Sequence, residues 1–332
     1  MEYREPILAE CWVSHPAEWQ DDLASWVAAS GVPVFHEWIQ YGGSRVCGVT
    51  LGSGGAERPV RLLAAVPHAH EPAPTAALVN LASVLLRGCF VDGSPVSADG
   101  PLPISDGLIR TLRQRFLLTL LPDTNSQGRL GSPRRTWDGE LTNDEFLKVA
   151  FGEAADGARF GRYPEWSWSV HRARKAGVVY EQLDEEAWVE PNTSRRSTHT
   201  RAVDELYARY RYTHHLDMHQ HEGDEATLYS ADFDDLPPAE LAEVEAWGAA
   251  IRSAWEAAGI RHKGGYVPYR GLPRQQFFRE YWAGRCPGML RLTTETRNNR
   301  HIPTDEPTPL ERQFRSAWTA LTATLGFLAA ER

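Results

Sequence analysis

Residues 58–72 read RPVRLLAAVPHAHEP, an aliphatic run that ends in two histidines and a glutamate. The run is too short for a buried helix, contains valine and leucine, and has proline at both ends, which favours a strand of a largely parallel sheet. Residues 74–86 follow as a helix, with proline in the first turn and Gly88 beyond the end. Open α/β sheets bind ligands between a strand and the helix that follows it, so we expect the polar residues here to form a site.

Two metal-binding patterns overlap at the end of this run. His68 and Glu71 form an H-x-x-E pair, which a turn leaving a strand can fold around one ion. His68 and His70 form an H-x-H pair, which shares one face of a strand and is typical of barrel amidohydrolases. The remaining interpretation is that all three are surface loop residues. A second segment favours the H-x-x-E pair.

That segment is residues 213–224, THHLDMHQHEGD, a short strand that ends in histidine with an acidic residue two positions earlier. His219 would complete a set of two histidines and one glutamate, and three protein ligands leave a fourth zinc position for water, as in catalytic sites. A third strand, GMLRLTTETR at residues 288–297, carries Glu295, which could act as a general base. The three strands together predict a hydrolytic metal centre.

The order H-x-x-E, D-M-H and T-T-E-T, between about residues 58 and 297, resembles the zinc carboxypeptidases of the M14 (carboxypeptidase A-like) family. The resemblance implies that His68, Glu71 and His219 bind one zinc ion per chain and that Glu295 is the general base. It also implies an α/β fold with one domain, in which helices flank a mixed, mostly parallel and twisted sheet. His70 stands where the family commonly has arginine, and the interval from Glu71 to His219 is somewhat long.

The choice of His219 has alternatives within the same strand. If residues 212–218 form the strand, His219 follows its end as His68 follows its own strand. His215 would share the face of His219 but lie about 13 Å back along the strand. Geometry and the resemblance favour His219 over His221, and Asp217 is expected to support the ligand.

The resemblance also implies an arginine that polarises the scissile carbonyl, from the loop that follows residue 122. Arg129 and Arg135 are the candidates there, and Arg297 on the late strand is a third. Basic residues on a solvated loop remain the alternative interpretation.

Other residues are expected to contact the substrate. The family places an Asn-Arg pair on the terminal carboxylate, which suggests Asn192 with Arg195 or Arg196, although the two are not adjacent here. A mobile loop tyrosine closes over substrate in the family, and Tyr266 and Tyr269 are the candidates for that role.

Composition narrows the class of protein. The 332 residues are 42% hydrophobic and 24% charged, with no apolar run long enough to cross a bilayer, so we expect a soluble globular domain covering residues 1–332. The net charge of −9 argues against a nucleic-acid partner. Four scattered cysteines and the absence of a recognisable signal peptide or prosegment favour the cytoplasm. Residues 140–190 are tryptophan-rich and are interpreted as a specificity insertion.

These observations predict a zinc-dependent hydrolase of amide bonds, most simply a carboxypeptidase that releases a C-terminal amino acid from a peptide or peptide-like metabolite. The alternatives are a deacylase of small N-acyl amino acids and a metal-containing binding protein without turnover. A barrel amidohydrolase is disfavoured, because eight regular strand-helix units are not found.

Overall fold

The computed structural model describes residues 10–52, 60–132, 139–223, 226–229, 236–266 and 277–330. Its main sheet has eight strands in the order β1-β2-β4-β3-β10-β13-β11-β12. The four central strands β4, β3, β10 and β13 are mutually parallel, whereas β1, β2 and β11 add antiparallel pairs. The strands are β1 (Val34–Ile39), β2 (Arg45–Leu51), β3 (Val60–Ala65), β4 (Phe116–Leu121), β10 (His214–His221), β11 (Ala226–Tyr229), β12 (His262–Tyr266) and β13 (Leu290–Arg297). The predicted mixed, mostly parallel α/β sheet is confirmed.

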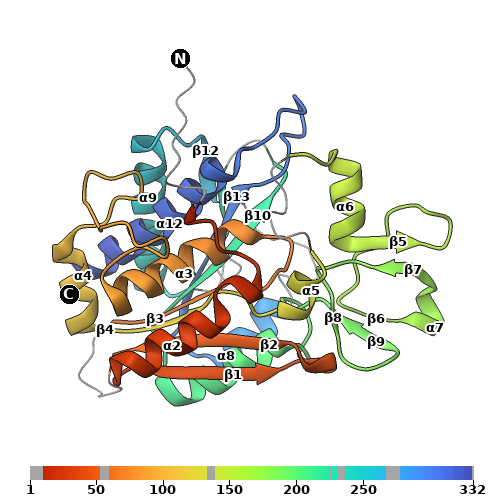
Figure 1. Ribbon diagram of the computed structural model, residues 1–332, viewed down its shortest axis with the longest axis horizontal. Helices are drawn as coiled ribbons and strands as arrows, with labels where there is room; N and C mark the ends of the chain where they lie inside the picture. The colour runs from red at the N-terminus through yellow and green to blue at the C-terminus, as the bar shows by residue number, and fades with distance from the viewer. Residues whose placement is uncertain are drawn as a thin grey trace.

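Helices cover both faces of this sheet (Figure 1). The larger core lies under α2 (Gln20–Ser30), α3 (Pro72–Arg87), α4 (Asp106–Arg115), α9 (Pro238–Ala257) and α12 (Leu310–Ala330). The smaller core, on the other face, lies under α8 (Thr198–Tyr210) and the π-helical turn η3 (Phe278–Trp282). Because the central parallel strands are buried on both faces, β3 and β4 carry nearly continuous aliphatic runs, whereas β10 and β13 alternate apolar residues with the polar residues of the site. FLLTLL in β4 is the clearest example, with all six residues buried.

The expected strand and helix around the H-x-x-E pair both form. Strand β3 ends at Ala65, and α3 begins at Pro72 with Glu71 as its N-cap residue. Proline suits this first helical position, because it has no N–H to leave unbonded. The helix ends at Gly88, whose φ of 82° is the left-handed conformation that favours glycine. The backbone therefore turns sharply between the last residue of β3 and the first of α3, where His68 lies.

Strand β10 is longer than the sequence suggested. Its parallel pairing with β13 continues from His214 opposite Leu290 to His221 opposite Arg297. His219 therefore lies inside the strand and not just after its end, because a long parallel partner extends the ladder beyond the apolar residues. Residues 262–266, expected as part of a glycine-rich loop, instead form β12 at the sheet edge.

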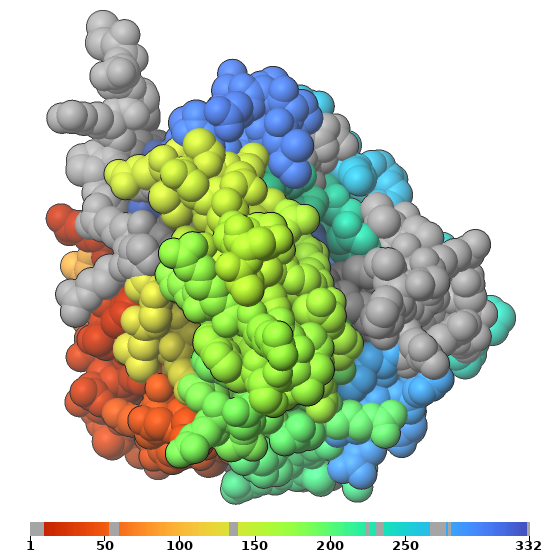
Figure 2. All heavy atoms as spheres, turned by 90° about the vertical axis from the view of Figure 1, so that its right-hand side faces the viewer, coloured from red at the N-terminus to blue at the C-terminus, as the bar shows by residue number. Residues whose placement is uncertain are grey.

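The segment from residue 143 to 189 forms a lobe beside the sheet (Figures 1 and 2). It contains α6 (Asn143–Phe151) and α7 (Trp168–His171), with a two-stranded and a three-stranded sheet. Those sheets are built from β5 (Gly152–Ala154), β6 (Glu165–Ser167), β7 (Ala173–Ala176), β8 (Glu181–Gln182) and β9 (Ala187–Val189). The lobe has its own hydrophobic cluster, which includes Phe146, Phe160, Trp166 and Tyr180. Trp166 stacks on Trp188 at 5.4 Å between ring centroids, so these tryptophans stabilise the lobe itself.

No helix in the described ranges is both long enough and apolar enough to cross a bilayer.

Candidate metal centre

His68, Glu71 and His219 converge at the carboxyl ends of β3 and β10. Two backbone hydrogen bonds fix the chain after β3. The Thr124 N–H donates to the Val66 carbonyl at 3.0 Å, and the Glu71 N–H donates to the His68 carbonyl at 3.2 Å, which closes the turn. At the start of α3, the Ala73 N–H donates to the Gln220 side chain on β10 at 2.9 Å. This last bond joins the turn to the strand that carries His219.

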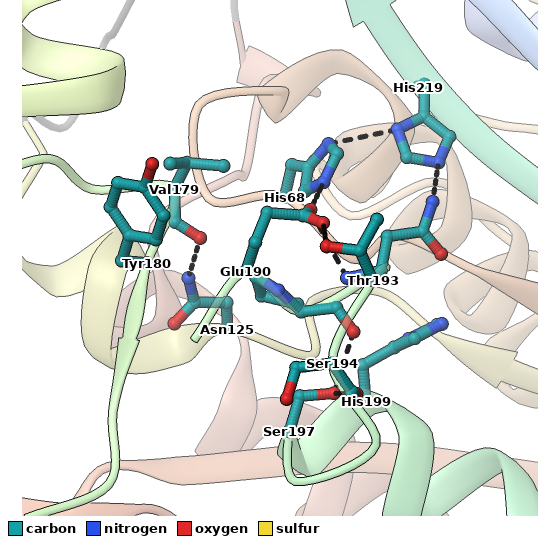
Figure 3. Close-up of polar contacts among 12 residues, drawn as sticks. His68, Asn125, Val179, Tyr180, Glu190, Thr193, Ser194, Ser197, His199 and His219 are labelled. Carbon is teal, nitrogen blue, oxygen red and sulfur yellow. Dashed lines mark hydrogen bonds and ion pairs between the residues drawn. The ribbon is translucent and has the colours of Figure 1, made fainter. Parts of the chain in front are cut away.

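The rings of His68 and His219 face each other at short range (Figure 3), and Glu71 completes the group that could hold one metal ion. His68 Nδ1 lies 2.9 Å from Glu71 Oε1, and His219 Nδ1 lies 2.9 Å from Glu71 Oε2. The two Nδ1 atoms are 3.1 Å apart. All three residues are at most 3% exposed. The structure therefore brings together the three residues that the sequence nominated as metal ligands.

Carboxylates hold the other ring nitrogen of each histidine. His68 Nε2 contacts Glu190 Oε1, and His219 Nε2 lies 3.1 Å from Asp217 Oδ2. The Asn192 side-chain nitrogen lies 3.2 Å from His219 Nε2. A carboxylate behind a histidine fixes the ring and leaves the opposite nitrogen available as a ligand.

The donor set fits a zinc ion. When Nε2–H of each histidine donates to its carboxylate, both Nδ1 atoms present lone pairs toward the oxygens of Glu71. In this tautomer the three groups repel one another unless protons or a metal ion lie among them. Two imidazoles and one carboxylate are a common catalytic zinc set, with ligand atoms about 3.3 Å apart in a tetrahedral site. The observed separations of 2.9 to 3.1 Å need to open by only a few tenths of an ångström.

The same carboxylates control the protonation of the two histidines. Burial disfavours the charged form of His68, but Glu71 and Glu190 outweigh burial and raise its pKa. Burial likewise opposes charge on His219, but Asp217 and Glu71 raise its pKa well above the usual value. Burial would raise the pKa of Glu71, but His68 and His219 hold it well below its usual range. A metal ion would therefore compete with protons at both imidazoles.

The alternative H-x-H pattern, in which His68 and His70 share one ion, does not form among the described residues. His70 is buried and its ring stacks on His68 at 5.3 Å between centroids, with Nε2 3.5 Å from Glu71 Oε1. It packs against Phe146 and Phe151 of α6, so it links the centre to the lobe. Within the described ranges, neither His70 nor His221 belongs to the group that can share one ion.

Glu295 lies beside the three groups. It pairs in register with His219 across β10 and β13, so the two side chains project from the same face of the sheet. Glu295 is 7% exposed. This position suits a general base next to a metal-bound water, although the base role itself stays a prediction.

Arg129 contacts the backbone of the turn that carries His68 and Glu71. It is 1% exposed in α5 (Ser126–Leu130), and its Nη2 donates to the carbonyls of His68 and Glu71 at 3.2 and 3.1 Å. The same nitrogen donates to Thr75 Oγ1 at 3.2 Å. Arg129 therefore holds the ligand-bearing turn from behind. Arg135, the other candidate, lies outside the described residues.

The two arginines proposed for the substrate carboxylate each contact another side chain. Arg196 lies 3.3 Å from Glu165 on β6 and has a half-exposed side chain, and the Arg195 guanidinium lies over the Tyr281 ring at 5.2 Å. Asn192 is 1% exposed and contacts His219. The residue after Asn192 is Thr193, whose hydroxyl donates to Glu190 Oε2. The proposed grip of Asn192 with Arg195 or Arg196 on a substrate carboxylate stays a prediction.

The two tyrosine candidates stay untested. The backbone of Tyr266 ends β12, and Tyr269 lies outside the described residues. Sequence reasoning missed Glu190, which precedes Asn192 by two residues but lies 122 positions from His68. The only feature of the sequence that could have indicated Glu190 is that it is an acidic residue in a Glu-Pro-Asn turn. It also missed a buried group around His199 and Arg291.

Comparison with solved structures identifies the fold. A metallo-carboxypeptidase from Burkholderia cenocepacia aligns over 93% of this chain and 69% of its own, with a TM-score of 0.55 and 15% identity. Carboxypeptidase A from Helicoverpa armigera aligns over 97% and 75%, with a TM-score of 0.58 and 12% identity. The chain has the metallo-carboxypeptidase fold. A third similar structure is the metallo-carboxypeptidase of Pseudomonas aeruginosa in complex with (2-guanidinoethylmercapto)succinic acid, with a TM-score of 0.52 and 14% identity over 93% of this chain and 68% of its own.

Comparisons of sequence alone give no such match: no family model and no curated protein matches the chain. The metallo-carboxypeptidase fold is thus recognisable from the arrangement of the backbone at identities of 12 to 15%. It explains why the H-x-x-E turn and the strand with His219 lie side by side, since both belong to the central parallel strands of this fold.

Proposed function

We propose that the protein is a zinc-dependent hydrolase that cleaves an amide bond and releases an amino acid. The observation that carries this proposal is the convergence of His68, Glu71 and His219 within 3.1 Å of one another, with Glu295 in register beside them. We further propose that these three residues bind one zinc ion per chain. A zinc ion held there supplies Lewis acidity and a bound water of lowered pKa, from about 15.7 to about 7.

The chain's own residues perform the remaining steps. Glu295 would take the proton of the attacking water and pass it to the leaving amine. Glu190 and Asp217 keep the rings of His68 and His219 oriented, because each carboxylate contacts the ring nitrogen opposite Nδ1. Arg135 is retained as the predicted oxyanion donor, since Arg129 binds backbone carbonyls instead. Tyr266 and Tyr269 remain the predicted residues that close over substrate.

Two substrate classes are consistent with this centre. A carboxypeptidase that releases a C-terminal residue from a peptide or peptide-like metabolite agrees with the fold. A deacylase of small N-acyl amino acids is the second class, and Asn192 with Arg195 or Arg196 is retained as the proposed grip on the carboxylate of either substrate. We propose that the lobe of residues 143–189 acts as the specificity insertion, since Phe146 and Phe151 contact His70 at the centre.

The four cysteines Cys11, Cys47, Cys89 and Cys286 are all free. This agrees with the proposal that the protein works in the cytoplasm, where thiols stay reduced.

The test combines metal content with hydrolysis. Purified wild type should contain one zinc per chain by mass spectrometry, and His219→Ala should lose it. The matched control is His221→Ala, which removes a histidine from the same strand and should keep the metal. Wild type should hydrolyse members of a panel of N-acyl amino acids and short peptides, whereas Glu295→Gln should keep zinc and lose activity by at least about a hundredfold. Metal retention in His219→Ala would refute the ligand set, and zinc binding without any hydrolysis would indicate a binding protein.

A further inference from the structure

A groove with several arginines lies where the end of α9 meets the beginning of α12, and we call it the α9–α12 groove. Both helices lie away from the lobe (Figure 1). The groove consists of three neighbouring hollows that share Ile260, with volumes of about 280 Å³ beside α12, about 500 Å³ beside β12 and about 10 Å³ in the narrowest. Its arginines are Arg261, Arg297, Arg312 and Arg315. Arg261 and Arg297 also have interaction partners within the protein. The mechanism proposed above uses none of the four.

The backbone on the α9 side of the groove is satisfied without these arginines. The Trp255 Nε1–H of α9 donates to the Ser316 carbonyl of α12 at 3.1 Å, which fixes the two helices against each other. The Ile260 N–H donates to the Trp255 carbonyl at 2.8 Å, and the Gly259 N–H donates to the Glu256 carbonyl at 3.0 Å. The last turn of α9 therefore has backbone donors of its own and does not require arginine side chains as caps.

Positive charge exceeds negative charge in the groove. Each of its two glutamates has a basic neighbour: Glu311 lies 3.8 Å from Arg315, and Glu256 lies 3.3 Å from His262. Arg312 is exposed and has no ion pair with any described residue. The Arg312 guanidinium is therefore a donor whose charge is not compensated within the described part of the chain.

The beginning of α12 adds to this preference for an anion. Leu310 is the first residue of this 21-residue helix, and the carbonyl of the preceding Pro309 accepts the Gln313 N–H at 3.1 Å. Proline has no side-chain oxygen, so Pro309 cannot cap the N–H groups of the first turn as serine or aspartate would. The beginning of a long helix attracts anions through these N–H groups and the helix dipole. Pro309 and Arg312 line the same hollow.

A buried hydroxyl provides a second, independent indication of a ligand. Thr308 is 1% exposed and lines the narrowest hollow together with Arg312. Its N–H donates to the Asn299 carbonyl at 2.7 Å, and its carbonyl accepts from the Gln313 side chain at 2.8 Å. Its Oγ1, by contrast, has no hydrogen-bond partner among the described residues. Buried polar atoms are normally bonded, and a hollow of this volume has room for about one oxygen atom.

We propose that the α9–α12 groove binds a phosphate group, either of inorganic phosphate or of a small phosphate monoester. The Thr308 hydroxyl, the Arg312 guanidinium and the first turn of α12 offer donors from three directions. A phosphate group has enough oxygens to accept from all three, whereas a carboxylate has only two. The larger hollow beside β12 has room for the organic part of a monoester. This site is separate from the proposed hydrolytic centre and does not depend on it.

The first test is calorimetric titration of the full-length protein with inorganic phosphate and with glycerol phosphate, at low ionic strength. Wild type should bind one phosphate group per chain, with an affinity that decreases as salt is added. Tighter binding of glycerol phosphate would identify a monoester as the ligand, and equal or weaker binding would identify inorganic phosphate. The absence of saturable binding of both would overturn the proposal.

Variants of the groove locate the bound phosphate. Arg312→Gln should weaken binding by at least about tenfold, and Arg312→Lys should fall between this variant and wild type. Thr308→Val keeps the shape of the side chain without the hydroxyl and should weaken binding by about 5- to 10-fold. Arg110→Gln is the matched control, because it removes an exposed arginine from α4 and should bind as wild type does. Equal binding by Arg312→Gln and wild type would overturn the proposal.

A further variant separates the groove from the metal centre, where phosphate could also bind a metal ion. His219→Ala should bind phosphate as wild type does. Loss of binding in His219→Ala, with unchanged binding in Arg312→Gln, would place the phosphate at the metal centre and refute the groove. Circular dichroism checks the folding of each variant. Phosphate should also raise the Tm of wild type and of His219→Ala more than that of Arg312→Gln, because only a ligand of the folded state stabilises it.

Discussion

His68 Nδ1 and His219 Nδ1 face each other at 3.1 Å although the two residues are 151 positions apart in the chain. Each ring is held from behind by a carboxylate, Glu190 for His68 and Asp217 for His219. Both carboxylates raise the pKa of the histidine they contact, against the effect of burial. The two histidines are therefore oriented before any ion binds, and their orientation depends on residues outside the three-ligand set.

The contact between Glu190 and His68 should strengthen metal binding. Glu190→Gln removes the charge behind the ring but keeps its size, and zinc affinity is expected to fall by about 10- to 100-fold. Competition with a chromophoric chelator measures this change. Glu165→Gln is the matched control, because Glu165 pairs in register with Val189, the neighbour of Glu190, but contacts the exposed Arg196. Equal affinities in all three proteins would show that Glu190 does not support the ligand.

Arg129 is expected to stabilise the turn and not the transition state. Arg129→Met removes the donor to the buried carbonyls of His68 and Glu71 and should lower the free energy of unfolding by about 1–3 kcal/mol, because these acceptors lose a charged partner. Denaturant unfolding measures this loss. Arg113→Met is the control, since Arg113 donates to the carbonyl of Leu85 near the opposite end of α3. Unchanged stability with a large loss of kcat would instead restore the oxyanion role.

Zinc affinity should rise with pH. Because the pKa values of His68 and His219 are raised, both imidazoles carry protons at pH values where free histidine is neutral, and zinc must displace them. The apparent association constant should therefore increase by up to about a hundredfold per pH unit below the raised pKa values and then level off. Chelator competition between pH 6 and 9 checks this slope. A flat profile would mean that the histidines are neutral throughout.

His36 should make the fold sensitive to acid. Burial, followed by the charge of Arg209, lowers the pKa of His36 to about 4, and Nε2 lies 2.8 Å from Thr50 Oγ1. Between pH 6.5 and 4 the unfolded chain binds a proton that the folded protein does not. The contribution of His36 to the free energy of unfolding is therefore complete above pH 6.5. As the pH decreases from 6.5, this contribution decreases by at most about 1.4 kcal/mol per pH unit. Urea unfolding in chelator, compared with His36→Gln, isolates this contribution, because the other titrating groups are common to both proteins. Parallel pH profiles would contradict it.

Much of the fold and part of the site followed from local patterns. The strand before His68 and the helix after it were predicted, because an aliphatic run between prolines and a proline-to-glycine helix depend on nearby residues only. The positions of Glu190 and Arg291 in buried contacts were not predicted, since nothing in their local sequence distinguishes them from charged residues on the surface. The contact of Arg196 with Glu165 on β6 was not predicted either, because it joins residues 31 positions apart.

Residue type and spacing were sufficient to nominate His68, Glu71, His219 and Glu295, because a metal centre needs these few groups at the ends of strands, and strand ends can be recognised from hydrophobic patterning. The arrangement around them required the folded chain. Parallel pairing of β10 with β3 and β13 decides which of the four histidines in β10 meets His68. The packing of the turn after β9, which carries Glu190, decides which carboxylate orients His68. These contacts join residues more than a hundred positions apart, so their partners are determined by packing in three dimensions and not by neighbours in the chain.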